Sequence, residues 1–137
     1  MRIAMDTDVL VAALRSPSGA SRRLIELLRA GQISAVATVG MMVEYEAVLT
    51  REEHLTASGL TRAEIIIFLE GLAGLMLPVD PHFLWRPQLA DPNDEMVLEA
   101  AVNGGAERIV TFNVSDYSLA AHRFGISVER PGDTLRR

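Results

Sequence analysis

Apolar residues recur along the chain in two spacings that alternate from one end to the other. Short runs such as 2–5 and 33–38 have the length and composition of buried strands. Longer segments such as 41–49 repeat apolar residues every three or four positions, which predicts helices with one buried face. The pattern predicts strands at 2–5, 33–38, 76–79, 108–111 and 126–128, and helices at 9–14, 24–31, 41–49, 65–77, 92–103 and 115–124, the fourth of which leads into the third strand.

Several of these helices carry their own start and stop signals. Thr61 and Glu64 have the spacing of a capping box, Asp91 followed by Pro92 is typical of a helix start, and Gly31 is typical of a helix end. Strands and helices that alternate with short connections predict a parallel sheet flanked by helices, with right-handed crossovers. The chain is 137 residues long and has no internal repeat or linker, so residues 1–137 are expected to form a single domain.

Composition narrows the possible chemistry. The absence of cysteine excludes disulfide scaffolds and thiolate metal sites, and all 13 basic residues are arginines, so a mechanism that needs a catalytic lysine has no candidate. The net charge of −5 argues against broad, nonspecific nucleic-acid binding. No apolar run reaches the roughly 18 residues of a membrane span, and the N-terminus lacks the layout of a secretory signal, so a cytoplasmic protein without membrane contact is expected.

Acidic side chains gather where the predicted strands end. In an open parallel sheet, ligands bind beyond the carboxyl ends of the strands, and like charges gathered there repel one another unless a cation compensates them. Oxygen ligands without cysteine or clustered histidine suit Mg²⁺ or Mn²⁺, which support phosphodiester hydrolysis. The residues concerned are Asp6 and Asp8 after the first strand, Asp91 and Asp94 at the start of a helix, and Asn113 and Asp116 after the strand that ends at Thr111.

Each acid also has a purely structural interpretation. Helix capping alone explains Asp91, and Asp6 has the same alternative. Asp94 falls in register with the buried stripe of its helix, where a carboxylate needs a partner, and this favours a functional role. Glu44 and Glu46 lie at opposite margins of an apolar stripe, and helical geometry does not choose between them.

Other polar and sulfur-containing residues give weaker signals. Asp116 is equally consistent with an acid that favours the dipole of its helix. The histidines are isolated and lack ligand spacing, so surface positions are expected. Methionines adapt to varied protein partners, but core packing is the favoured interpretation here. These histidines are His54, His82 and His122, and the methionines are Met41, Met42, Met76 and Met96.

Four short motifs follow one another along nearly the whole chain. They are Met5-Asp6-Thr7-Asp8-Val9-Leu10, Met42-Val43-Glu44-Tyr45-Glu46, Asp91-Pro92-Asn93-Asp94-Glu95 and Thr111-Phe112-Asn113-Val114-Ser115-Asp116-Tyr117. Their order and spacing resemble the PIN-domain superfamily, and in particular the VapC-like toxins of bacterial toxin-antitoxin pairs. The first motif resembles the Asp-Thr-Asn-Val-Leu of that family's first strand, and the second resembles its helix with a central Glu.

This resemblance implies a three-layer α/β/α sandwich with a mainly parallel sheet and an Mg²⁺- or Mn²⁺-dependent endoribonuclease activity. It also implies a homodimer and a small antitoxin encoded alongside. It selects Glu44 over Glu46. Asp8 stands where the family usually has Asn, and Asn113 stands where some members carry an acid, so the fourth carboxylate would be Asp116 and the number of metal ions stays open.

On this basis, acids from the four motifs would hold the metal, and Glu44 would either bind it or orient the attacking water. Threonines beside the acids are expected to hydrogen-bond them, and arginines near the mouth are candidates for RNA contact, with surface solubility as their alternative. The catalytic and metal-binding candidates are Asp6, Glu44, Asp94 and Asp116; the supporting candidates are Thr7, Asp8, Asp91, Thr111 and Asn113; the arginines are Arg15, Arg22, Arg23 and Arg51.

Two other functions fit part of the pattern. Asp6-Thr7-Asp8 also resembles the start of a haloacid-dehalogenase-like, Mg²⁺-dependent phosphatase, although such enzymes normally add a lysine and a larger body or cap. A PIN-like module that acts only through protein contacts is the second alternative, because Asn113 weakens the acidic set. A phosphatase assay beside an RNA assay, together with Mn²⁺ titration, separates these alternatives from a nuclease.

Overall fold

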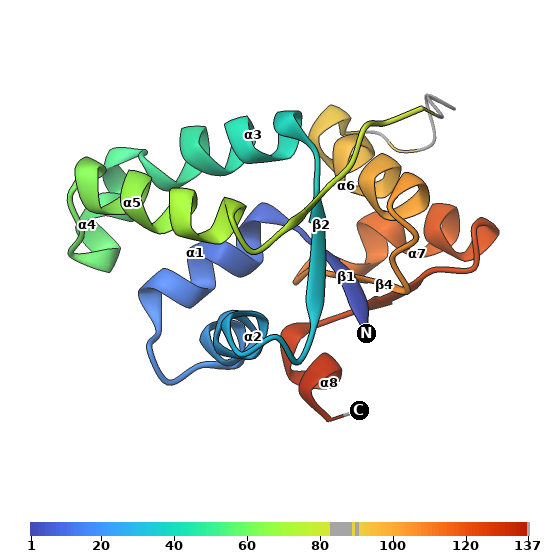
Figure 1. The fold of residues 1–137 in the computed structure, drawn as a ribbon, viewed down its shortest axis with the longest axis horizontal. Helices are drawn as coiled ribbons and strands as arrows, with labels where there is room; N and C mark the ends of the chain where they lie inside the picture. The colour runs from blue at the N-terminus through green and yellow to red at the C-terminus, as the bar shows by residue number, and fades with distance from the viewer. Residues whose placement is uncertain (83–88, 90, 137) are drawn as a thin grey trace.

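A five-stranded parallel sheet forms the centre of the computed structural model, which describes residues 1–82, 89 and 91–136 (Figure 1). The strands lie in the order β3-β2-β1-β4-β5, and each pairs in parallel with its neighbours. The predicted parallel α/β architecture is therefore confirmed. The strands are β1 Arg2–Met5, β2 Ser34–Ala37, β3 Leu77–Pro78, β4 Arg108–Val110 and β5 Ser127–Glu129.

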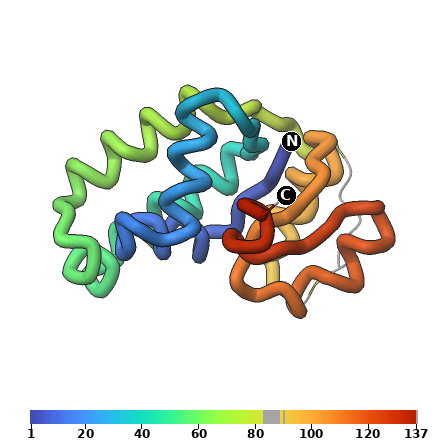
Figure 2. The backbone as a smooth tube through the Cα atoms, turned by 90° about the horizontal axis from the view of Figure 1, so that it is seen from below, coloured from blue at the N-terminus to red at the C-terminus, as the bar shows by residue number. Residues whose placement is uncertain are grey.

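Helices cover both faces of this sheet, which gives the expected three-layer α/β/α sandwich (Figures 1 and 2). In Figure 1, α1, α2, α3 and α5 lie on one side of β2, whereas α6 and α7 lie on the other. Helix α2 packs against α1 and α8, and α6 packs against β1, β2, β4 and α7. The helices are α1 Thr7–Arg15, α2 Ala20–Arg29, α3 Val39–Leu49, α4 Glu52–Ser58, α5 Arg62–Ala73, α6 Pro92–Asn103, α7 Val114–Arg123 and α8 Pro131–Leu135.

The predicted helix starts are present in the structure. The Thr61 side chain accepts a hydrogen bond from the backbone N–H of Glu64 at 3.2 Å, and the Glu64 carboxylate accepts one from the N–H of Thr61 at 3.0 Å, which completes the capping box. Asp91 caps α6 by accepting a hydrogen bond from the N–H of Asn93 at 2.9 Å. The local sequence therefore sets the position at which α5 and α6 begin.

The apolar pattern misses two short helices, α4 and α8. Helix α4 has no buried residue, so it lacks the apolar stripe by which the other helices are recognised, and Gly59 ends it in a left-handed conformation with φ of 74°. Helix α8 is five residues long, which is too short to display a helical period. Instead of one helix that ends in a polar stretch, the chain between residues 41 and 58 forms α3 and α4 with a break at Thr50 and Arg51.

The buried core lies on both faces of the central strands, where Ile3, Val36 and Ile109 are fully buried. No helix in the described ranges is long and apolar enough to cross a membrane. Gly104 ends α6 at a close approach between layers, because a Cβ atom there would lie 2.8 Å from both Val36 Cγ1 and Val79 Cγ2. Only glycine lets the end of α6 pack this closely against β2 and the residue that follows β3.

The topology singles out one position on the edge of the sheet. Strands β1 and β4 are neighbours, but the chain leaves β1 into α1 on one face and leaves β4 into α7 on the other. Such a switch point opens a crevice at the carboxyl ends of the two strands, where open α/β sheets bind their ligands. Asp6 follows β1 and Thr111 follows β4, so both lie at this crevice.

Candidate active site

Asp6 is fixed at the switch point by three hydrogen bonds. Its backbone N–H donates to the Val110 carbonyl at 3.0 Å, its Oδ1 accepts from the N–H of Thr7 at 2.8 Å, and its Oδ2 accepts from the Thr111 hydroxyl at 2.8 Å. Burial raises the pKa of Asp6, although the two hydrogen bonds that its carboxylate accepts from Thr111 and Thr7 act in the opposite direction. The expected hydrogen bond from Thr111 is present, whereas Thr7 contributes its backbone N–H.

Asp8 ties the first turn of α1 to the loop after β4. Its Oδ2 accepts hydrogen bonds from the N–H of Phe112 at 3.0 Å and from Asn113 Nδ2 at 3.1 Å. Its Oδ1 is buried and has no hydrogen-bond partner within the described residues. Burial, followed by the charge of Asp6, raises the pKa of Asp8 to about 6. Asp8 and Asn113 therefore join two segments of the crevice that are far apart in sequence.

Asp94 lies near Asp6, with a tyrosine hydroxyl beside both acids. Asp94 is half-buried on the first turn of α6, as its register predicts, and its Oδ1 accepts a hydrogen bond from the Tyr117 hydroxyl at 3.0 Å. The same hydroxyl is near enough to Asp6 to lower the pKa of that carboxyl group. Burial raises the pKa of Asp94 to about 6, with smaller contributions from neighbouring acids. Two acids from different motifs thus lie beside the Tyr117 hydroxyl, which donates its hydrogen bond to Asp94.

Asp116 and Asp91 act on this pair through their charges. Asp116 is exposed on the first turn of α7, and its charge raises the pKa of both Asp6 and Asp94. Asp91 caps α6, as its structural interpretation requires, and its charge also raises the pKa of Asp94. The acids of the first, third and fourth motifs are therefore near enough to influence one another through their charges.

Glu44 lies on the side of α3 that faces α6. Glu44 is half-buried, whereas Glu46 is exposed and lines a groove between α3 and α5. Gly40 is one turn before Glu44 on the same face, and a Cβ atom on Gly40 would lie 3.0 Å from Met96 Sδ of α6. This orientation favours Glu44 over Glu46 as the member of the acidic set, and its role in that set stays a prediction.

The arrangement of these acids suits a hard cation. Within residues 1–82, 89 and 91–136, no three histidine or acidic side chains are already placed as a ready set of metal ligands. Asp116 and Asp6 nevertheless raise the pKa of Asp94, and Asp94 Oδ2 has no hydrogen-bond partner in this part of the chain. Carboxylate oxygens that repel one another and keep an open lone pair fit Mg²⁺ or Mn²⁺ better than softer ions.

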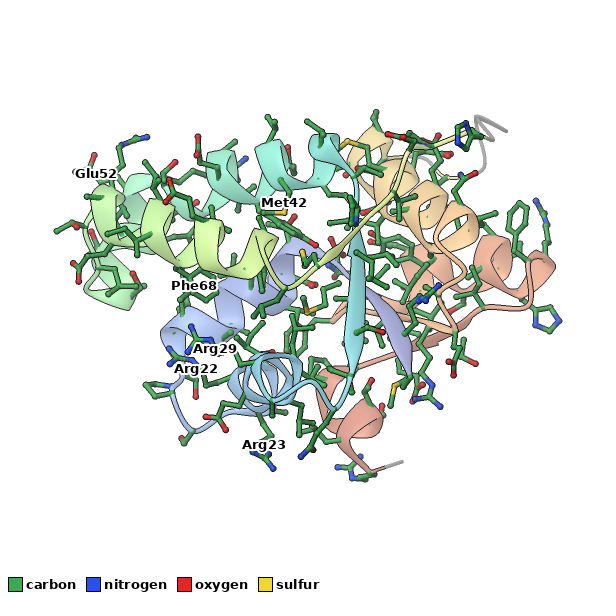
Figure 3. All side chains as sticks on the ribbon, viewed as in Figure 1. Arg22, Arg23, Arg29, Met42, Glu52 and Phe68 are labelled. Carbon is green, nitrogen blue, oxygen red and sulfur yellow. The ribbon has the colours of Figure 1, made fainter. Side chains whose placement is uncertain are left out.

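The arginines expected to contact RNA occupy another part of the molecule. Arg22 donates a hydrogen bond to the Ala13 carbonyl at 3.0 Å, and Arg15 contacts His54 Nδ1 at 2.9 Å, so both lie at the C-terminal half of α1. Helix α1 is nine residues and therefore about 14 Å long, with Asp6 at its other end. Figure 3 shows Arg22 and Arg23, which belong to α2. Arg23 forms a surface ion pair with Glu26, and Arg51 precedes α4. Their RNA contact stays a prediction.

The remaining sequence expectations concern packing. His82 and His122 are exposed as expected, whereas His54 is half-buried because it lies against Arg15. The methionines pack as core residues, since two are buried and two are partly buried against the core. The buried ones are Met41 and Met76, and the partly buried ones are Met42, labelled in Figure 3, and Met96.

Sequence reasoning missed the two tyrosines that organise the site. Tyr117 is fully buried and donates a hydrogen bond to Asp94, and Tyr45 is buried with its hydroxyl donating to the carbonyl of Met5, directly before Asp6. Burial raises the pKa of both tyrosines far above the ordinary value, so both hydroxyls stay protonated donors. A signal existed, because each tyrosine lies on the apolar stripe of its helix and a buried tyrosine hydroxyl needs a partner.

Comparison with known families agrees with this geometry. A family model described as PIN domain matches residues 2–115, which include the first three motifs and most of the fourth, while Asp116 and Tyr117 follow directly after the match. No curated protein matches the chain significantly. The match leaves the haloacid-dehalogenase-like phosphatase without support. Because it spans well over half of the sequence, the chain belongs to the PIN domain family.

Proposed function

We propose that this chain is a metal-dependent endoribonuclease that hydrolyses phosphodiester bonds in RNA. PIN domains are generally nucleases, and they typically bind RNA and use divalent metal ions. The observation that carries the proposal is the gathering of Asp6 and Asp94 at the switch point of the sheet, where the charge of Asp6 raises the pKa of Asp94 and Tyr117 donates its hydrogen bond to Asp94. No described cationic side chain pairs with either carboxylate, so their burial is costly unless an ion joins them.

The roles of the acids follow from their surroundings. Asp6, Asp94 and Asp116 would hold the ion, and Mg²⁺ or Mn²⁺ bound there supplies water activation and charge stabilisation on the phosphate. Thr111 and Tyr117 donate hydrogen bonds that keep Asp6 and Asp94 in place. Glu44 would bind the same ion or orient the attacking water and accept its proton.

Asp8 and Asn113 have a supporting role in this proposal. They hold the start of α1 against the loop after β4. This loop leads from Thr111 into α7, whose first turn contains Asp116. A rigid link at this point keeps the ligands of the first and fourth motifs at a constant separation, which metal binding needs. Asp91 supports Asp94 because it caps the N-terminus of α6, and Asp94 lies on the first turn of that helix.

We also propose that the chain is the toxin of a toxin-antitoxin pair, a single-domain cytoplasmic protein that acts as a homodimer and is inhibited by a small cognate antitoxin. The support is the order of the four motifs, which resembles VapC-like toxins. Expression of the chain should arrest growth, and co-expression of a short protein encoded in the neighbouring reading frame should relieve the arrest. If cells that express the chain grow normally although the purified protein cuts RNA, the toxin role is wrong and the function is RNA processing.

The nuclease is tested with purified protein and a structured RNA, in the presence of Mn²⁺ or Mg²⁺. The wild type should cut the RNA, and Asp6→Asn and Asp94→Asn should each abolish cutting while circular dichroism shows an unchanged fold. Asparagine is a good helix cap, so the first substitution preserves the start of α1. Glu107→Gln is the matched control, because Glu107 is exposed at the amino end of β4 on the opposite edge of the sheet.

Two results would overturn the proposal. Undiminished cutting in both variants would show that the acids do not form the site. Failure of the wild type to bind Mn²⁺ in a titration would favour a PIN domain that acts only through protein contacts, whereas binding that is lost in Asp94→Asn supports the nuclease. Hydrolysis of an aryl phosphate without RNA cleavage would instead indicate a phosphatase.

A further inference from the structure

A cavity beside the crevice of the candidate active site lies on the same edge of the sheet, at the ends of β2 and β3. It has a volume of about 300 Å³, which is small enough for one aromatic ring system, and it opens where β2 and β3 end. Its walls come from the start of α3, from the residues after β3 and from α6. All of these residues belong to the described part of the chain.

The strand register places this cavity directly beside the proposed active site. Ala4 pairs with Val36, so the register carries Asp6 opposite Thr38, which lines the cavity. Val79 continues the same row, because its N–H donates to the Ala37 carbonyl at 2.9 Å. Neighbouring strands lie about 5 Å apart, so Thr38 and Val79 are roughly one and two strand spacings from Asp6. A strand of RNA that crosses the acids would pass over the cavity.

The lining of the cavity combines apolar surfaces with one exposed carboxylate. Val39, Val79 and Met96 provide surfaces against which a flat ring can stack, and Asp80 provides two oxygen acceptors. Glu99 also lines the cavity, but it is buried on the second turn of α6 and has an interaction of its own. The negative charge of Asp80 repels a phosphate, so an uncharged part of the nucleotide suits this cavity better.

Gly40 keeps one wall of the cavity open. A Cβ atom at this position would lie 3.0 Å from Met96 Sδ, which is tighter than ordinary van der Waals contact. Gly40 and Met96 both line the cavity, so the missing side chain leaves room between α3 and α6. The backbone of Gly40 has no positive φ, so its conformation does not require glycine.

We propose that this cavity binds a guanine base of the RNA next to the bond that is cut. Guanine presents N1–H and N2–H₂ side by side, and this donor pair matches the two oxygens of one carboxylate. Uracil offers carbonyl oxygens on both sides of its single N–H, which carboxylates repel. The acids over β1 and β4 therefore supply the chemistry, and the cavity over β2 and β3 supplies base selection.

This inference rests on the proposed function, but a binding experiment tests it separately. Guanosine, which has no phosphate, is titrated into the metal-free protein, and nuclear magnetic resonance follows the Gly40 amide and the Met96 methyl group. We expect both signals to move with guanosine and to move much less with uridine. Asp80→Asn and Gly40→Ala should weaken guanosine binding by about tenfold, which is the loss expected for a good paired hydrogen bond or a filled site. Glu107→Gln should leave it unchanged.

A second experiment measures selection during cutting. With an RNA of randomised sequence, the wild type should prefer guanine at one fixed position beside the cut, and Gly40→Ala should reduce this preference by about tenfold while the total rate stays within a few-fold. Equal response to guanosine and uridine, or an unchanged preference in Gly40→Ala, would overturn the proposal. Guanosine binding by a protein that cuts no RNA would support the cavity and refute the nuclease, so the two failures are distinguishable.

Discussion

The two halves of the carboxyl edge are built differently. Over β1 and β4, the side chains of Asp6 and Asp8 accept hydrogen bonds from the loop after β4, and Asp6 also accepts one from the N–H of the adjacent Thr7. Over β2 and β3, Val39 and Asp80 are exposed. Within the part of the chain that the structure describes, the Asp80 carboxylate forms no hydrogen bond or ion pair. The comparison teaches that side chains held by hydrogen bonds are concentrated at the proposed catalytic half, while the proposed base-binding half leaves its exposed side chains free to adjust to a ligand.

The largest expected effect separates the two halves by activity. Asp94→Asn should reduce RNA cleavage by about 10³-fold or more, as is usual for a residue at the centre of a catalytic site. Asp80→Asn, the same chemical change in the other half, should alter the total rate by less than about tenfold, because it affects binding of one base. Single-turnover rates on one RNA measure both. Equal losses would mean that the two halves do not divide chemistry from selection.

The next effect tests whether Tyr117 positions Asp94. Tyr117→Phe removes the hydroxyl at 3.0 Å from Asp94 Oδ1 but keeps the ring that fills the core. Loss of such a supporting hydrogen bond should lower Mn²⁺ affinity or activity by about 10- to 100-fold. Isothermal titration with Mn²⁺ gives the affinity directly. An unchanged affinity together with an unchanged rate would assign Tyr117 to packing alone.

A smaller effect concerns stability and pH. The folded protein has the pKa of Asp8 raised to about 6 from 3.8, so the stability that Asp8 contributes is fully present below pH 4 and is lost as pH rises through 6. At pH 7.5, the free energy of unfolding of Asp8→Asn should therefore exceed that of the metal-free wild type by on the order of 1 kcal/mol, a value already reduced because Asp8 is partly exposed. At pH 4 the variant should show no such gain.

Thermal melting in a chelating buffer measures this difference. Asparagine keeps an oxygen that accepts the hydrogen bond from the Phe112 N–H, so the comparison isolates the charge. A gain of equal size at both pH values would show that packing, and not ionisation, separates the two proteins. Such a result would remove electrostatic strain as a distinguishing feature of the β1–β4 half.

The smallest effect is expected in the β2–β3 half. Gly40→Ala replaces a residue inside the first turn of α3, where alanine favours the helix, and the added methyl meets the flexible end of Met96. The two contributions nearly cancel, so stability should change by about 0.5 kcal/mol or less. Chemical denaturation measures this. A loss several times larger would show that Gly40 is required for packing and would weaken its use as a probe of the cavity.

Local signals predicted most of the framework. Asp91 and Pro92 marked the start of α6, and the position of Asp94 on the apolar stripe predicted its partial burial, because both depend on residues within one or two turns. The run before Asp6 predicted β1 with its correct end. The bounds of α4 were not predicted, since an exposed helix has no apolar stripe.

Contacts between distant elements could not be predicted in the same way. The choice between Glu44 and Glu46 depends on which side of α3 faces α6, and helical periodicity contains no information about a neighbouring helix. The hydrogen bond from Tyr117 to Asp94 depends on the packing of α7 beside α6. The cavity needs three elements at once, so no motif in the sequence marks it.

The glycine at the end of α6 has a consequence for how a mutational scan of this protein would be interpreted. Gly104 is remote from the acids and has no reactive group, yet a bulkier residue there would push α6 away from β2 and the chain after β3. Helix α6 carries Asp94 on its first turn and Met96 and Glu99 further along. A substitution at Gly104 would therefore lower both the activity and the base selectivity of the protein, because it displaces α6. In a mutational scan, Gly104 would resemble a catalytic residue although it takes no part in the chemistry.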